Sequence, residues 1–209
     1  MLDCEFVPAK ESASRRVMVV LHGLGDSMEG YRELPLMLRL PWLNYQLVNA
    51  PDPYYGGFSW FDIYGDRSPG IERSRIEVTG LINHLVEQGY QSSDISLLGF
   101  SQGCLMTIDV GLRYPHPLAC LVGISGWVHE PEKLLAELSP VARDQRLLVT
   151  HGTRDPLIPA GPVKTQHELL KKAGIQLTYK EYNKEHTIAG EAEFSDIRSF
   201  VQKAYNMGA

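Results

Sequence analysis

The sequence predicts an α/β fold in which a mostly parallel sheet of six or seven strands is covered by helices on both faces. Short runs of apolar and β-branched residues alternate along the chain with longer stretches of helical periodicity. These runs are continuously apolar, which is typical of parallel strands buried between two layers of helices. The chain has 209 residues, 44% of them hydrophobic and 22% charged. We therefore expect residues 1–209 to form a single domain.

Each expected element follows from its local pattern. The apolar runs predict strands at 17–21, 45–48, 95–98, 120–124, 147–150 and 177–182. Helical periodicity, with a glycine or proline beyond the end of the first three stretches, predicts helices at 71–87, 102–113, 161–172 and 191–205.

Composition excludes several classes of function. The formal net charge is −5 and no run of Lys or Arg forms a stripe, so nucleic acid and anionic membrane surfaces are poor partners. No apolar run approaches the ~20 residues of a membrane span. We expect no integral membrane segment, no signal peptide and a cytoplasmic location. The three cysteines show no CxxC spacing and read as free thiols.

We expect neither a metal nor a cofactor. There is no HExxH motif and no phosphate-binding GxxxxGK[ST] loop. The glycines after His22 resemble the start of a dinucleotide fingerprint, but Met28 stands where its third glycine belongs.

The segment 51–69 differs from the rest of the chain because it has no clear period and is rich in aromatic residues. Six of them lie between positions 51 and 64: Tyr54, Tyr55, Phe58, Trp60, Phe61 and Tyr64. A loop this apolar has to bury its rings, either as a plug over the core or as a wall of a ligand site. The sequence leaves both interpretations open.

The pentapeptide from Gly99 to Gly103 is a G-x-S-x-G motif centred on Ser101. It lies between an expected strand and an expected helix, which is the setting of a nucleophile elbow. Its glycines permit a sharp turn that raises the serine hydroxyl above the sheet, and the N–H of Gln102 opens the helix beside it. The alternative is a serine in an ordinary βα turn.

A nucleophilic serine needs a base and an acid to orient that base. In α/β-hydrolases the acid and then the histidine follow the serine along the chain. Asp155 leaves the expected strand 147–150, and His186 follows the expected strand 177–182. Both would lie with Ser101 at the carboxyl edge of the sheet, where ligands bind in open α/β folds. The alternatives are an Asp-Pro turn initiator and an exposed loop histidine.

An oxyanion hole needs a second N–H besides that of Gln102. The segment 21–26, Leu-His-Gly-Leu-Gly-Asp, leaves the strand 17–21. Glycines on both sides of Leu24 allow its N–H to turn into the site.

These residues resemble the phospholipase/carboxylesterase family of α/β-hydrolases, the small serine carboxylesterases grouped with acyl-protein thioesterases. The matching segments run in family order across nearly the whole chain: 21–26, 59–63, 99–103, 124–126, 151–155 with 158–159, and 186. The resemblance implies the α/β-hydrolase fold, a catalytic triad of Ser101, His186 and Asp155, and an oxyanion hole from Leu24 and Gln102. Members of this family are often homodimers, so the resemblance is also compatible with a homodimer.

The same resemblance implies that Trp60 and the loop around it, Phe58 included, line the acyl groove. The aromatic loop and Trp127 indicate an apolar acyl site, to which we add Ile158 from a matching segment. The chain departs from the family pattern at Cys104 and Glu185, where the family usually has glycine. A carboxylate at Glu185 would favour the protonated form of the neighbouring histidine.

The sequence thus predicts a serine carboxylic-ester hydrolase that acts on small or medium acyl esters through an acyl-enzyme intermediate. The alternatives are an acyl thioesterase or lysophospholipase, and a non-catalytic binding module on the same fold. The expected partner is a small-molecule ester or thioester. No stretch remains for a separate cap domain, so we expect an open, shallow site with the segment 51–69 as its main movable cover.

Overall fold

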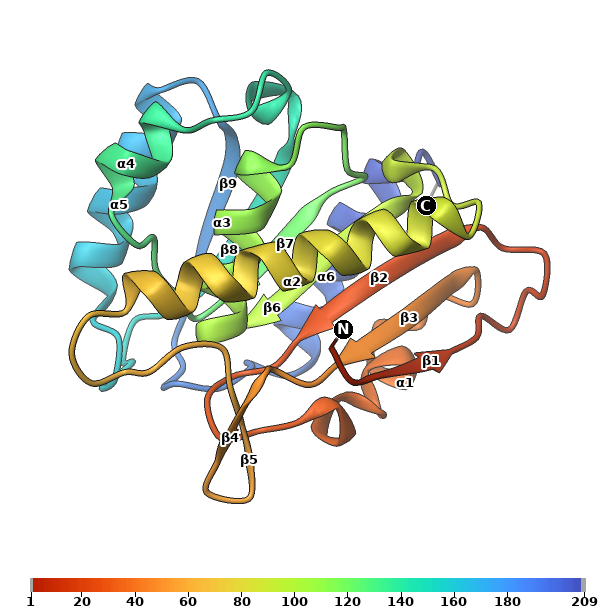
Figure 1. Cartoon of the computed structure of the whole chain (residues 1–209), viewed down its shortest axis with the longest axis horizontal. Helices are drawn as coiled ribbons and strands as arrows, with labels where there is room; N and C mark the ends of the chain where they lie inside the picture. The colour runs from red at the N-terminus through yellow and green to blue at the C-terminus, as the bar shows by residue number, and fades with distance from the viewer. Residues whose placement is uncertain (1, 208–209) are drawn as a thin grey trace.

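The computed structural model describes residues 2–207 (Figure 1). Its helices are α1 (Leu34–Leu38), α2 (Ser68–Glu87), α3 (Gln102–Arg113), α4 (Pro131–Ala136), α5 (Ala160–Lys172) and α6 (Glu191–Ala204), with short 3-10 turns at Met28–Tyr31, Ser92–Asp94 and Ala142–Asp144. Its strands are β1 (Cys4–Val7), β2 (Arg16–Leu21), β3 (Leu43–Val48), β4 (Asp52–Tyr54), β5 (Gly57–Ser59), β6 (Ile95–Phe100), β7 (Leu121–Ile124), β8 (Arg146–Gly152) and β9 (Gln176–Tyr182).

One seven-stranded sheet runs through the molecule in the order β1-β3-β2-β6-β7-β8-β9. Adjacent strands of this sheet are parallel, except that β1 is antiparallel to β3 at one edge. The strand order reverses between β3 and β6, so the carboxyl ends of β2 and β6 flank the point where open α/β sheets bind ligands. The predicted α/β-hydrolase fold is confirmed, and no separate cap unit interrupts the described residues.

The sheet has helices on both faces because side chains of each central strand alternate between two cores. In β2, Val17 and Val19 belong to the core beneath α2, α3, α4 and α5. Met18 and Val20 belong to the opposite core, beneath α1 and α6. Figure 1 shows α2 and α3 on the near face and α1 and α6 behind the sheet. This two-sided burial explains why the strands are continuously apolar in sequence.

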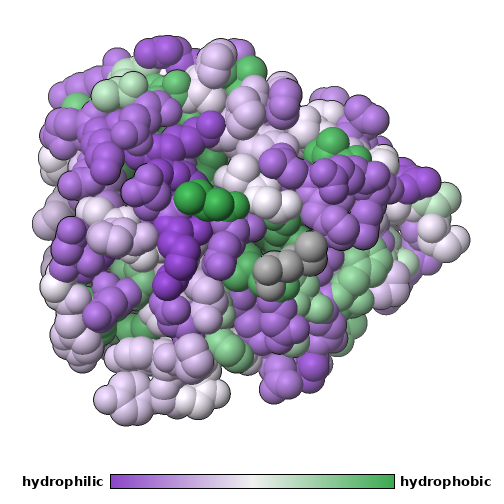
Figure 2. All heavy atoms as spheres, in the orientation of Figure 1, coloured by the Kyte–Doolittle hydropathy of each residue, from purple (hydrophilic) through white to green (hydrophobic). Residues whose placement is uncertain are grey.

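The near face of the molecule, which α2 crosses, is mostly hydrophilic with scattered hydrophobic residues (Figure 2). On α2 the large exposed apolar side chains are Ile76 and Val86. None of the helices within residues 2–207 is both long and apolar enough to span a bilayer.

The aromatic segment 51–69 is built differently from the loop that we expected. It contains the hairpin of β4 and β5, whose two-residue turn has φ of 44° at Tyr55 and 92° at Gly56. Positive φ at both positions is the type I′ geometry that suits a tight hairpin. Trp60 and Phe61 are fully buried, whereas Tyr55 is 95% exposed at the tip. The base of the segment is thus a plug in the core.

Candidate active site

The turn that carries Ser101 joins β6 to α3 and is sharply bent. Ser101 has φ 55° and ψ −114°, a conformation that residues with a side chain rarely adopt and that a nucleophile elbow requires. A Cβ on Gly99 would lie 2.0 Å from the carbonyl oxygen of Gly103, and one on Gly103 would lie 2.0 Å from that of Leu21. Both glycines are therefore needed so that α3 can lie against β6 and β2.

Ser101, His186 and Asp155 meet beyond the carboxyl ends of β6, β9 and β8. The imidazole Nδ1 of His186 lies 2.7 Å from Oδ2 of Asp155, and its Nε2 lies 2.9 Å from the hydroxyl of Ser101. An ionised carboxylate can only accept, so Nδ1 carries the proton and donates it. Nε2 is then the basic nitrogen and accepts the hydrogen bond from the serine hydroxyl.

The carboxylate of Asp155 is held in place by its own loop. Its Oδ1 accepts hydrogen bonds of 2.9 Å from the N–H groups of Leu157 and Ile158. Burial alone would raise the pKa of Asp155, but these bonds and the one from His186 hold that pKa below its ordinary value. A second buried imidazole, His151, lies 3.7 Å from Oδ2. Burial lowers the pKa of His151, so the ionised Asp155 faces an uncharged neighbour on that side.

Leu24 and Gln102, the two residues predicted to supply the N–H groups of an oxyanion hole, line the same cavity as the serine. Gln102 is the first residue of α3, where an N–H has no acceptor within the helix. Leu24 lies in the loop after β2, and strand β5 pairs with that loop. The N–H of Gly25 donates to the carbonyl of Phe58, and the N–H of Phe58 donates to the carbonyl of Asp26, each over 2.9 Å. The hairpin thereby fixes the backbone around Leu24.

The side chain of Gln102 has a separate structural role that sequence reasoning missed. Its Oε1 accepts from the N–H of Trp60 at 2.9 Å and from the hydroxyl of Ser59 at 3.3 Å. Its Nε2 donates to the carbonyl of Phe61 at 2.9 Å, and the indole N–H of Trp60 donates to the carbonyl of His22 at 2.9 Å. All five residues are buried. No local pattern reveals these contacts, because they depend on where the hairpin packs.

The loop that carries His186 is fixed by a buried ion pair, which sequence reasoning also missed. Nζ of Lys184 donates to Oε1 of Glu193 at 2.6 Å, and the other oxygen of Glu193 accepts from the N–H of Ala189 at 2.5 Å. The side chains of Lys184 and Glu193 are 3% and 0% exposed. A Cβ on Gly152 would lie 2.4 Å from the Lys184 carbonyl oxygen, so this loop also lies directly against the end of β8.

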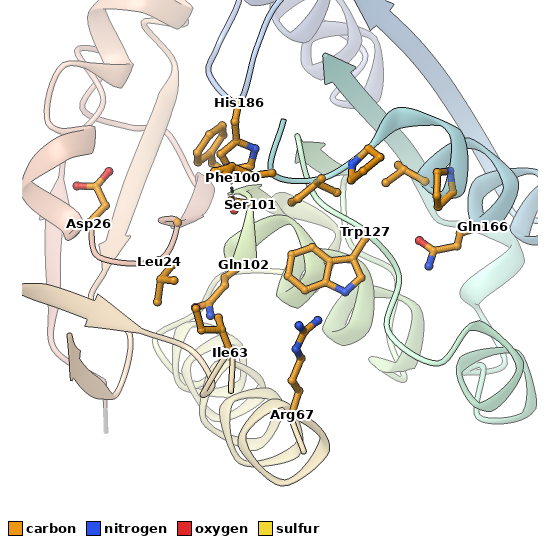
Figure 3. Close-up of a pocket in the computed structure, with 16 residues that line it drawn as sticks. Leu24, Asp26, Ile63, Arg67, Phe100, Ser101, Gln102, Trp127, Gln166 and His186 are labelled. Carbon is orange, nitrogen blue, oxygen red and sulfur yellow. Dashed lines mark hydrogen bonds between the residues drawn. The ribbon is translucent and has the colours of Figure 1, made fainter. Parts of the chain in front are cut away.

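A cavity of about 690 Å³ opens beside Ser101 (Figure 3). Trp127 and Ile158, two residues predicted to contact substrate, line it. Trp60 and Phe58 do not line it. Trp60 is fully buried, and the partly buried Phe58 packs against the core beneath α2. The apolar side chains of the wall are those of Leu24, Ile63, Phe100, Trp127, Leu157, Ile158, Pro159, Pro162 and Val163.

The two departures from the family pattern have different surroundings. Cys104 is fully buried and fills space that a Cβ on Gly123 or Gly126 would enter. Burial raises the pKa of its thiol to about 12, which keeps it protonated. The side chain of Glu185 is 68% exposed and lies 3.9 Å from Arg154. Its carboxylate therefore lies where solvent and that guanidinium screen its charge.

The fold and the comparisons place the chain among the α/β-hydrolases, as a serine hydrolase of the carboxylesterase type. A sequence model of the phospholipase/carboxylesterase family matches residues 2–205, and the chain belongs to this family. The predicted family and enzyme class are thus confirmed.

Individual relatives agree with this assignment. Acyl-protein thioesterase 1 of Schizosaccharomyces pombe is 33% identical over 165 residues, covering 71% of this chain and 72% of the relative. A probable carboxylesterase of Oryza sativa subsp. japonica is 28% identical over 223 residues, covering 96% and 84%. The crystal structure of esterase PE8 superposes with a TM-score of 0.87 at 29% identity, covering 97% of this chain and 99% of that one.

Proposed function

We propose that this protein hydrolyses carboxylic esters of small or medium acyl groups, with Ser101 as nucleophile, His186 as general base and Asp155 as the residue that orients His186. The hydrogen-bonded series from the serine hydroxyl through the imidazole to the carboxylate, 2.9 and 2.7 Å long, carries the proposal. It supplies a base at the nucleophile and a fixed tautomer at the base, which a binding module would not require.

In the first half-reaction, the hydroxyl oxygen of Ser101 attacks the ester carbonyl while its proton passes to Nε2 of His186. The carbonyl oxygen becomes an anion and is bound by the N–H groups of Leu24 and Gln102. The C–O bond to the alcohol then breaks, and Nε2 returns its proton to the leaving alkoxide. Asp155 stabilises the imidazolium in between.

In the second half-reaction, water replaces the serine. It attacks the acyl-enzyme and gives its proton to the imidazole, and the acid is released as Ser101 is reprotonated. We further propose that residues 1–209 act as one domain. A cytoplasmic location remains a prediction.

Replacement of the serine is the direct test. We expect Ser101→Ala to lower kcat on p-nitrophenyl butyrate by about 10⁴–10⁶-fold. A fluorophosphonate should label the wild-type protein at Ser101 and leave the variant unlabelled. Near wild-type hydrolysis by a folded Ser101→Ala protein would overturn the assignment, and a wild-type protein that resists the label would favour the binding module.

An acyl thioesterase is the second candidate, favoured by the similarity to acyl-protein thioesterase 1. The same two steps would then release a thiol. Butyryl-CoA and p-nitrophenyl butyrate share one acyl group, so the ratio of their kcat/KM values reports the leaving-group preference alone. A chain-length series from C2 to C16 in both forms would define the acyl limit.

A further inference from the structure

Three side chains that carry hydrogen-bond donors, those of Arg67, Trp127 and Gln166, line the active-site cavity. The guanidinium carbon of Arg67, at the start of α2, lies 5.8 Å from the centre of the Trp127 ring. Gln166, on α5, uses Oε1 to accept a hydrogen bond of 3.0 Å from the N–H of Val128, which leaves its NH₂ group as the available end. Figure 3 shows Arg67 and Gln166 both extending toward Trp127 from two different sides.

The cationic side chain of Arg67 forms no ion pair with the part of the chain that the structure describes. None of the ion pairs formed within residues 2–207 includes Arg67, whereas Arg73 and Arg75 on the same helix pair with Asp52 and Asp109. A cation–π contact with an indole helps to position a guanidinium and leaves its N–H groups able to donate to another group. Arg67 is thus partly buried, and it has no anionic partner among the residues that the structure describes.

The charged residues of the cavity lie on opposite sides of it. Among the described residues that line it, Asp26 is the sole carboxylate, and Figure 3 places Asp26 on the opposite side of the site from Arg67 and Gln166. An anionic group on a bound molecule would be repelled at one end and attracted at the other.

The two halves of a substrate can be assigned to these ends. Phe100 and His186 line both the main cavity and a second hollow of about 420 Å³ that Tyr31, Ile188 and Phe194 border. The leaving group has to meet Nε2 of His186 to receive its proton. His186 lines both hollows, but Trp127 and the apolar wall belong to the first alone, so we assign the leaving group to the second. The acyl chain then extends the other way, across the apolar wall toward Trp127.

We propose that Arg67, Gln166 and the indole N–H of Trp127 form a subsite for a carboxylate at the far end of the acyl chain, so that the enzyme favours half-esters of dicarboxylic acids. This inference rests on the proposed function. A planar guanidinium matches the two oxygens of a carboxylate, and the intervening apolar wall, Ile63 and Val163, suits the methylene chain.

A matched pair of esters tests the subsite. Mono-p-nitrophenyl suberate carries the carboxylate, and methyl p-nitrophenyl suberate has the same chain without the charge. We expect the wild-type protein to give the higher kcat/KM on the acid. In Arg67→Gln we expect the ratio of acid to methyl ester to fall by about 10-fold or more, the usual effect of losing a charged hydrogen-bond partner. Hydrolysis of the methyl ester should fall by less than that of the acid.

The control is Arg15→Gln, which removes the same charge from an exposed residue outside the cavity and should keep the wild-type ratio. The proposal is overturned if the wild-type protein does not prefer the acid, if Arg67→Gln retains the preference, or if both esters lose activity equally.

Calorimetric titration with the suberate dianion separates this proposal from the proposed function. Binding that is weakened in Arg67→Gln supports the subsite even if no ester is hydrolysed. Equal binding by the two proteins contradicts the subsite even if esters are hydrolysed normally.

Discussion

A single added methyl group at Gly57 tests whether the hairpin positions the proposed oxyanion hole. Gly57 begins β5, and a Cβ there would lie 2.2 Å from the carbonyl oxygen of Gly25 and 2.7 Å from that of Asp26. Carbon and oxygen in ordinary contact are roughly 3.3–3.6 Å apart. In Gly57→Ala the hairpin and the loop therefore have to separate by about 1 Å.

That separation would break the two hydrogen bonds between Phe58 and the loop, which now measure 2.9 Å each. At about 0.5–1.5 kcal/mol for each bond, we expect the free energy of unfolding to fall by about 1–3 kcal/mol. The N–H of Leu24 lies inside the displaced loop. Loss of one oxyanion donor typically lowers kcat by about 10²–10³-fold, so we expect a fall approaching that range with little change in KM.

The assay is steady-state hydrolysis of p-nitrophenyl butyrate, normalised to the folded fraction from urea denaturation. Gly80→Ala is the matched control, because its added Cβ meets nothing within 4 Å. It should keep wild-type kcat and gain up to about 1 kcal/mol of helix stability. If folded Gly57→Ala retains wild-type kcat, or loses activity only in proportion to its unfolded fraction, the hairpin does not position the donor.

Two further predictions concern buried ionisable groups. Glu193→Gln leaves Lys184 buried without its partner, so the free energy of unfolding measured in urea should fall by about 3–5 kcal/mol. The double variant Lys184→Met/Glu193→Leu should regain much of this loss, and an equally unstable double variant would contradict the explanation. Burial lowers the pKa of His167 to about 4 from its ordinary 6.5. Between these values the unfolded chain binds a proton that the folded chain does not, so stability falls as the pH falls, by up to about 1.4 kcal/mol per pH unit. His167→Leu should show a shallower pH dependence of its urea midpoint from pH 6.5 to 4, and an unchanged slope would exclude His167 as a source.

The sequence predicted the central elements because burial on both faces leaves a clear pattern. Strands β2, β6, β7 and β8 are buried almost throughout and contain runs of apolar residues, and α2 and α3 are long enough for their periodicity to be recognised. Strand β1 was not predicted, because a four-residue edge strand is only half-buried and does not need an apolar run. Helices α1 and α4 were missed because five and six residues are too few to reveal a period.

Part of the proposed site could likewise be predicted from the sequence, and part could not. Ser101, Asp155 and His186 could be located because each lies in the loop that follows a strand, and parallel topology brings such positions to one edge. The sequence could not show which of the aromatic side chains are buried, because an aromatic segment gives no local signal for which rings face the core. Trp60 is fully buried because hydrogen bonds from its backbone and indole N–H groups tie it to Gln102 and to the loop after β2. Those partners lie about 40 residues away in the chain.

Both proposed oxyanion donors depend on one short stretch, residues 57–61. The N–H of Leu24 is fixed through the pairing of Phe58 with Gly25 and Asp26, and Gln102 is tied through its amide to the backbone of Trp60. A shift of this stretch should therefore weaken both donors together. Phosphonylation of Ser101 places a P–O oxygen in the same hole, so a variant such as Gly57→Ala should slow labelling and ester turnover in parallel. A change confined to the Arg67 end of the cavity should alter turnover of acidic esters and leave the labelling rate unchanged.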